Sequence, residues 1–153
     1  METIEIKESR IIDAPPAAVH AVLADYRAGH AAILPQPYFK AMTVEEGGFG
    51  AGTVLRVQME VMGRTFHYHQ RVTEPEPGRV LVETDVDTGE WSSFTLDPLD
   101  NGRCTQVTIT ACQHIKPGFE GIMQRIAQPG IVRRIFRKEL QNLADYLIDQ
   151  KSE

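Results

Sequence analysis

Residues 116–149 read KPGFEGIMQRIAQPGIVRRIFRKELQNLADYLID, and this stretch predicts one long helix at the end of the chain. Pro117 suits the first turn of a helix, where its missing backbone N–H is not needed. The second half carries an apolar stripe at helical spacing: Ile131, Ile135, Phe136, Leu140, Leu143 and Leu147. A shorter stripe consists of Phe119, Met123 and Ile126. Between the two stripes lies Pro129-Gly130, the pair most able to kink or break the helix.

The chain before this helix reads mainly as short strands. Residues 3–13 and 38–45 alternate between apolar and polar side chains, as strands do. Asp13 is expected to cap a helix that starts at Ala14-Pro15-Pro16, and a shorter helical piece follows near residues 28–33. The glycines of residues 47–52 predict a turn between strands, because no Lys-Ser/Thr pair follows and the next segment is a strand rather than a helix.

Two strands at residues 55–61 and 66–72 form a predicted hairpin around a Gly63-Arg64 turn of type II′. Cross-strand partners then have residue numbers that sum to 127. One face of the hairpin is apolar apart from Tyr68 and Gln70, and the other is polar, so the sheet has one buried side. The apolar face carries Leu55, Val57, Met59, Val61, Phe66, Tyr68, Gln70 and Val72.

Asn101-Gly102 predicts a second hairpin, in which residues 91–96 pair with residues 105–111. Leu96 then faces Val107, Phe94 faces Ile109, and all four share the apolar face. Val82 of the preceding strand joins this face if the connecting turn has three residues, Asp87-Thr88-Gly89. That register directs Glu83 and Asp85 outward, and the sequence then predicts no pair of carboxylates placed for acid–base chemistry.

The predicted architecture is α+β: one strand, one or two short helices, six strands in hairpin order and one long helix. With 153 residues and no internal repeat or linker, the chain is expected to form a single domain spanning residues 1–153. An antiparallel sheet of about seven strands that curves around the terminal helix leaves a gap beside the helix, which is the default ligand site.

Charge and composition exclude several classes of partner. The net charge of -5 argues against non-specific nucleic-acid binding. There is no apolar run long enough for membrane insertion and no secretory leader. Cys104 and Cys112 lie in one predicted strand, about 26 Å apart, so we expect two buried free thiols and a cytoplasmic protein. The basic residues Arg133, Arg134, Arg137 and Lys138 form either a solvated helix face or a surface for an anionic partner.

The order of elements, together with Ile12-Asp13-Ala14-Pro15-Pro16 and Val22-Leu23-Ala24-Asp25, resembles the SRPBCC superfamily of START-like, Bet v 1-like helix-grip proteins. The polyketide cyclase/dehydrase group within it is the most similar. The glycine turn at residues 47–53, Glu74-Pro75 and Phe94-Thr95-Leu96 match in position and type. The resemblance implies a hydrophobic small-molecule pocket and an enzyme only in some branches. His20 and Ile33-Leu34 stand where an aromatic residue is common.

Several polar residues are weak candidates for chemistry. Tyr68 and Gln70 can orient a ligand carbonyl or belong to the core. His30 is expected at the cavity mouth, either as a general base or as a surface histidine. His67 and His69 share a face, and Glu60 opposite His67 can add a third metal ligand, but a solvated pair is the expected outcome.

The sequence therefore leaves three hypotheses: a protein that binds a lipid, quinone or aromatic polyketide-like molecule, a cyclase or dehydratase acting on such a ligand, and an interaction module on a larger assembly. We expect no cofactor and no metal, and the oligomeric state stays open. If the helix is broken at Pro129-Gly130, its first half can gate the cavity and should be the more mobile half. The predicted ligand-binding residues are Leu55, Val57, Met59, Val61, Phe66, Tyr68, Gln70, Val82, Phe94, Leu96, Ile109, Phe119, Met123 and Ile126.

Overall fold

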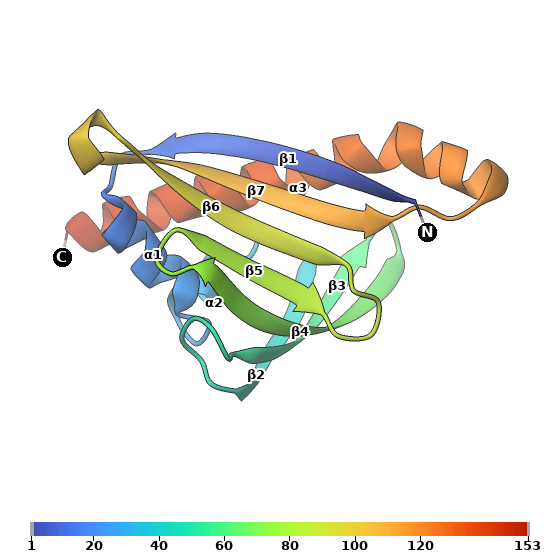
Figure 1. Cartoon of the computed structure of the whole chain (residues 1–153), viewed down its shortest axis with the longest axis horizontal. Helices are drawn as coiled ribbons and strands as arrows, with labels where there is room; N and C mark the ends of the chain where they lie inside the picture. Colours follow the sequence, from blue (N-terminus) through green and yellow to red (C-terminus); the bar gives the residue numbers. More distant parts are fainter. Residues whose placement is uncertain (1, 153) are drawn as a thin grey trace.

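The computed structural model describes residues 2–152, which form one seven-stranded antiparallel sheet with a long helix lying along it (Figure 1). The strand order is β1-β7-β6-β5-β4-β3-β2. Strands β2 to β7 therefore lie side by side in chain order, and β1 pairs with β7, so that β1 and β2 form the two edges of the sheet. This arrangement confirms the predicted α+β helix-grip fold. The elements are β1 Thr3–Ile12, α1 Pro16–Ala24, α2 Gly29–Ile33, β2 Phe39–Glu46, β3 Val54–Val61, β4 Arg64–Glu76, β5 Val80–Asp85, β6 Trp91–Leu99, the 3-10 turn Asp100–Gly102, β7 Cys104–His114 and α3 Gly118–Lys151.

The β3–β4 hairpin has the predicted faces but a different register. Its turn is Met62-Gly63, with φ of 50° and 78°, so both central residues are left-handed, as a type I′ turn requires. Met59 therefore faces Phe66 rather than Tyr68. Because side chains alternate with a period of two, a shift of two residues changes every partner but leaves each side chain on its predicted face.

The β5–β6 hairpin differs from the prediction by one residue, and this reverses β5. The carboxylate of Asp85 accepts the backbone N–H groups of Asp87 at 2.9 Å and Thr88 at 3.0 Å. The loop therefore begins at Val86 instead of Asp87. A one-residue slip moves every side chain of a strand to the other face. Glu83 pairs with Ser92 on the inner face of the sheet. The prediction that the side chains of Glu83 and Asp85 point outward was therefore wrong.

The β6–β7 hairpin confirms the predicted register. Leu96 faces Val107 and Phe94 faces Ile109, and all four side chains are buried. The thiols of Cys104 and Cys112 in β7 are free as expected, but they are only half-buried.

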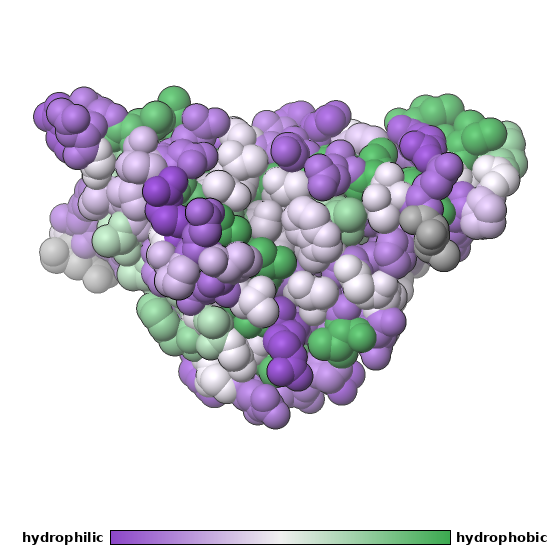
Figure 2. Space-filling view, viewed as in Figure 1, coloured by the Kyte–Doolittle hydropathy of each residue, from purple (hydrophilic) through white to green (hydrophobic). Residues whose placement is uncertain are grey.

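The helix α3 runs unbroken through Pro129, so the one long helix is confirmed and the Pro129-Gly130 pair does not break it. Its second half buries Ile135, Leu140, Leu143 and Leu147 in the core. Its first half extends past the end of the sheet (Figure 1), where Figure 2 shows a hydrophobic surface patch. There Phe119, Ile122, Met123 and Ile126 are 76%, 55%, 45% and 72% exposed. The greater mobility expected for this half remains a prediction.

The glycine turn between β2 and β3 fixes the end of α1, and this positions the segment that leads to α2. The Tyr26 N–H donates to Gly48 O and the Gly50 N–H donates to Ala24 O, both at 2.9 Å. Gly50 has φ of 63°, and a Cβ there would lie 2.5 Å from a Glu74 carboxylate oxygen. A glycine is therefore strongly favoured at this position. At the other end, α1 has Pro15 at its N-cap and no side-chain cap, so the capping role predicted for Asp13 was wrong.

Candidate functional site

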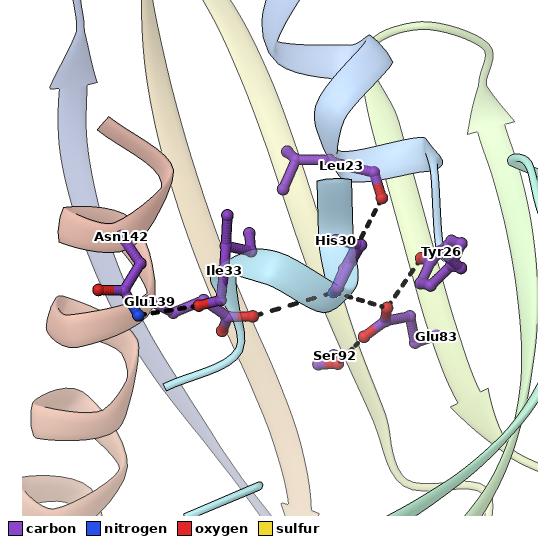
Figure 3. A network of polar contacts seen from close by, with 8 residues as sticks. All are labelled: Leu23, Tyr26, His30, Ile33, Glu83, Ser92, Glu139 and Asn142. Carbon is purple, nitrogen blue, oxygen red and sulfur yellow. Dashed lines mark hydrogen bonds and ion pairs between the residues drawn. The ribbon is translucent and has the colours of Figure 1, made fainter. Parts of the chain in front are cut away.

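Five polar side chains from different elements meet between the sheet and α3 (Figure 3). We call them the His30 cluster: Tyr26 after α1, His30 in α2, Glu83 in β5, Ser92 in β6 and Glu139 in α3. His30, Glu83 and Glu139 are 2%, 7% and 5% exposed. Buried ionisable groups are candidates for function, because burial of a charged group is costly unless another group pairs with it.

The imidazole of His30 is held in one orientation. Its Nδ1 lies 2.7 Å from Leu23 O, and because a carbonyl only accepts, Nδ1 carries the proton. The ring stacks on Tyr26 with centroids 4.4 Å apart and meets the edge of Phe94 at 5.3 Å. Its second nitrogen, Nε2, points toward two carboxylates, Glu83 at 3.6 Å and Glu139 at 3.9 Å.

Glu83 is the hydrogen-bonded carboxylate of the cluster. It accepts the hydroxyl of Tyr26 at 2.8 Å and that of Ser92 at 3.2 Å. Burial, together with the negative charge of Glu83, holds the pKa of Tyr26 well above its ordinary value. Tyr26 therefore remains a neutral donor, and the negative charge of the pair belongs to Glu83.

Glu139 is the protonated carboxyl of the cluster at neutral pH. Burial, and secondarily the nearby charge of Glu83, raises the pKa of Glu139 to about 8. The Asn142 amide one turn later donates to Ile33 O at 3.1 Å and ties α3 to α2. Near pH 7 the cluster thus holds an acid, Glu139, within 4 Å of a nitrogen that can accept a proton, His30 Nε2.

The sequence prediction missed this cluster for two reasons. His30 was expected at the cavity mouth but is buried. Glu83 was assigned to the outer face because the predicted register of β5 was wrong by one residue. Two signals were present. An aspartate at the start of a turn, here Asp85, commonly accepts backbone N–H groups two and three residues on. Glu139 lies four residues after Ile135 and four before Leu143, on the predicted buried stripe.

The predicted ligand-binding residues divide into a packed group and an open group. Leu55, Val57, Phe94, Leu96 and Ile109 are buried in the core. Toward the β3–β4 turn the inner face is only half-buried, and its side chains are Met59, Val61, Phe66, Tyr68 and Gln70. Val82 pairs with Ser93, which lies on the opposite face of the sheet from Phe94. The one-residue shift of β5 therefore places Val82 on the outer face, and its prediction as a ligand-binding residue of the inner face was wrong.

The open part of α3 continues the buried stripe of that helix. Eighteen residues make five turns, so Ile122 lies in line with Leu140, and Ile126 lies in line with Ala144. Leu140 is buried and Ala144 half-buried, whereas both isoleucines are exposed. Ile122 was missed by the sequence prediction. Phe119 and Met123 lie in line with exposed Arg137 and Gln141 and therefore flank the stripe rather than belong to it.

Tyr68 lies among the half-buried side chains of the inner face near the β3–β4 turn. Its ring stacks on Phe66 with centroids 6.5 Å apart. Burial raises the pKa of Tyr68 to about 12, with smaller contributions from the charges of Glu90 and Asp85. The hydroxyl therefore stays protonated at physiological pH and is available as a hydrogen-bond donor.

The outer face of the sheet does not form the metal site that His67 and His69 allowed. Glu60 faces Thr65 rather than His67, and His69 lies 3.0 Å from Glu45. Within residues 2–152 no group of three or more potential ligands can hold a metal ion. A hollow of about 350 Å³ on this face is lined by both histidines, Arg56 and Asp87 among others.

The basic face of α3 is partly engaged within the fold. Arg137 donates to Glu8 at 3.2 Å, and Lys138 donates to Gln36 O. In the part of the chain that the structure describes, no helix is long and apolar enough to cross a membrane.

Comparisons with known proteins agree with this geometry. A family model described as polyketide cyclase/dehydrase and lipid transport matches residues 3–147. Three solved structures illustrate the fold. The KanY protein (ms6282) is 26% identical, with a TM-score of 0.82, covering 96% of this chain and 99% of that one. The Zhui aromatase/cyclase from Streptomyces sp. R1128 is 20% identical, with a TM-score of 0.74 and coverage of 95% and 94%. A START superfamily protein from Mycobacterium smegmatis is 14% identical, with a TM-score of 0.73 and coverage of 95% and 98%. A search of curated proteins finds no match.

Proposed function

The chain belongs to the polyketide cyclase/dehydrase and lipid transport family, and from this premise we propose that it binds a hydrophobic small molecule between the inner face of the sheet and α3. The ligand is a lipid, a quinone or an aromatic polyketide-like molecule. Ligand binding is the function that the family and the exposed apolar surface support in common.

The observation that carries the proposal is the unfinished apolar stripe of α3. Ile122 and Ile126 are 55% and 72% exposed although they continue the stripe that buries Leu140. On the sheet, Met59 and Phe66 are half-buried on the same inner face that is fully buried nearer the core. Exposed apolar side chains mark a site for an apolar partner. A small molecule lying there would remove both sets from water.

Replacing Ile126 by Asn should weaken binding of a neutral apolar ligand by about tenfold, because full burial of an isoleucine side chain is worth about 1.5–3 kcal/mol. The ligand is first identified by native mass spectrometry and organic extraction of the freshly purified protein, and its affinity is then measured by titration. The matched control is Ala127→Asn, at an exposed neighbouring position of α3 that is off the stripe.

Two results contradict this prediction. One is equal affinity of Ile126→Asn and the unchanged protein. The other is an empty protein that shows no thermal shift with lipids, quinones or polyphenols, in which case the open surface does not serve a small molecule.

The second candidate function is a cyclase or dehydratase acting on the bound molecule, and the His30 cluster is the observation that favours it. In this reaction His30 Nε2 takes a proton from a methylene between two carbonyls. That carbon then attacks a distant ketone of the same chain, and the ketone oxygen receives the proton of Glu139. The new carbon–carbon bond closes the ring, and the proton on His30 passes to Glu139. His30 then removes the second proton of the former methylene, and the hydroxyl leaves as water with the proton of Glu139, which forms a carbon–carbon double bond. Tyr68 and Gln70 would orient the remaining carbonyls.

The enzyme candidate predicts that His30→Ala reduces turnover of a poly-β-ketone mimic at least about 100-fold with little change in its affinity, as expected for loss of a general base. The comparison variant is His20→Ala, which removes a histidine paired with Glu74 at 2.6 Å outside the cluster. Tyr68→Phe and Gln70→Leu should have smaller effects. A wild-type protein that binds the mimic and forms no cyclised or dehydrated product rules the candidate out.

A further inference from the structure

The His30 cluster brings two carboxyl groups together without a cation of the described chain at hydrogen-bonding distance from either. Glu83 and Glu139 contribute two carboxyl groups, and Asp85 lies beside them on the inner face of β5. Asp85 is satisfied by the N–H groups of its own turn. Within residues 2–152, no lysine or arginine forms an ion pair with Glu83 or Glu139, and His30 is the sole basic group within 4 Å of them.

His30 does not neutralise both carboxyl groups. Its Nδ1 is engaged with Leu23 O, and its Nε2 lies 3.6 Å from Glu83 and 3.9 Å from Glu139, beyond hydrogen-bonding distance to either. Glu83 has two hydroxyl donors, Tyr26 and Ser92. Glu139 accepts no hydrogen bond from any group of the described chain, although it is 5% exposed. Among residues 2–152, His69 Nε2 is the one fully buried side-chain nitrogen or oxygen atom without a hydrogen-bond partner, so the oxygens of Glu139 are not sealed from solvent and can accept a donor from outside the chain.

We propose that the His30 cluster is a subsite for the protonated amine of an otherwise apolar ligand. An ammonium group has three donors and one positive charge. Placed between Glu83 and Glu139, it supplies the hydrogen bonds that Glu139 lacks, and its positive charge favours the ionised form of Glu139. This inference rests on the proposed ligand-binding function and specifies the chemical class of the ligand: an amphipathic amine rather than a neutral lipid or an acid.

The inner face places the cluster beside the half-buried side chains of β4. Ser92, which donates to Glu83, is half-buried rather than fully buried. On β4, Gln70 pairs with Asp85, and Val72 pairs with Glu83. Same-face side chains along a strand are about 7 Å apart. An aromatic or aliphatic body lying against Tyr68 and Gln70 can therefore extend its amine one or two side chains further, to Glu83.

The test compares two commercial ligands that share one skeleton, tryptamine and tryptophol, which differ in an amine and a hydroxyl group. We expect tryptamine to bind at least about tenfold more tightly at pH 7, a difference typical of one buried charge pair. In Glu139→Gln and in Glu83→Gln/Glu139→Gln the affinity for tryptamine should fall to that for tryptophol, which itself should not change. Glu120→Gln, at an exposed position of α3, is the control.

A second readout detects the proton on Glu139. Its carboxyl faces Glu83 from β5 and His30 from α2, with Tyr26 donating to Glu83. Because Glu139 must ionise to receive an ammonium, tryptamine binding at pH 7 should release a proton, whereas tryptophol binding should not. Calorimetry in two buffers with different ionisation enthalpies measures this release. Glu139→Gln should abolish it.

The outcomes separate the inference from the proposed function. Tryptophol binding with equal or weaker tryptamine binding overturns the amine subsite and leaves hydrophobic ligand binding intact. Binding of neither ligand or of any other apolar probe overturns both. If the double variant does not fold, the single Glu139→Gln variant and the comparison of the two ligands on the unchanged protein decide the question.

Discussion

Replacing Leu143 by Ala should lower the free energy of unfolding by about 3 kcal/mol. Leu143 is fully buried and lies in the core formed by α3, the two short helices and the inner face of the sheet. The substitution removes most of an apolar side chain and leaves a cavity where neighbouring elements are tied to one another and cannot close it fully. Urea denaturation followed by circular dichroism measures the change, with an unchanged dependence on denaturant concentration expected.

The matched control for this prediction is Ile122→Ala on the same helix. Ile122 continues the same stripe but is 55% exposed, so its truncation should cost less than about 1 kcal/mol. The contrast tests the division of α3 into a packed half and an open half. Equal losses at Leu143 and Ile122 would mean that the first half of the helix is as closely packed in solution as the second, and the proposed ligand surface would then be absent.

The fold follows from patterns that can be read from the chain. The alternation of Val57, Met59 and Val61 along one strand specifies the inner face even though the hairpin register is shifted by two. A period of two is insensitive to that error. The helical stripe at Leu140, Leu143 and Leu147 likewise predicts which side of α3 meets the core, because each successive turn places an apolar residue on the same side of the helix.

The site is less predictable because it depends on single residues. Whether Glu83 points inward is decided by the one residue that separates a three-residue turn from a longer one, and no strand periodicity distinguishes them. His30 is buried by the meeting of α2, β6 and α3, which are far apart in sequence. The exposed half of α3 could not be predicted either, since Ile122 and Ile126 have the spacing of core residues. Only the three-dimensional positions of sheet and helix show that they are uncovered.

Replacing Glu139 by Gln should stabilise the protein at neutral and alkaline pH and leave it unchanged near pH 4. The pKa of Glu139 is about 8 in the folded protein, against an ordinary value of 4.5. A carboxyl group whose pKa is higher in the folded than in the unfolded protein contributes to stability. This contribution is fully present at a pH below the pKa of the group in the unfolded protein. That contribution is lost as the pH rises from about 4.5 through about 8. At pH 7 the loss is on the order of 3 kcal/mol, since each pKa unit corresponds to about 1.4 kcal/mol.

Glutamine keeps the shape of the neutral carboxyl group but cannot ionise. The stability of the variant therefore does not fall as Glu139 would ionise. The measurement is the difference in unfolding free energy between Glu139→Gln and the unchanged protein, determined by denaturant titration at steps from pH 4 to pH 9. Titrating groups outside the His30 cluster contribute equally to both proteins and cancel in the difference. The difference should grow from near zero at pH 4 and level off above pH 8. Glu120→Gln, which replaces an exposed carboxylate beside Lys116, should show no such rise. Parallel stability curves for Glu139→Gln and the unchanged protein would mean that Glu139 is already ionised and paired within the fold, and it would then not be free to receive the ammonium group of the proposed amine subsite.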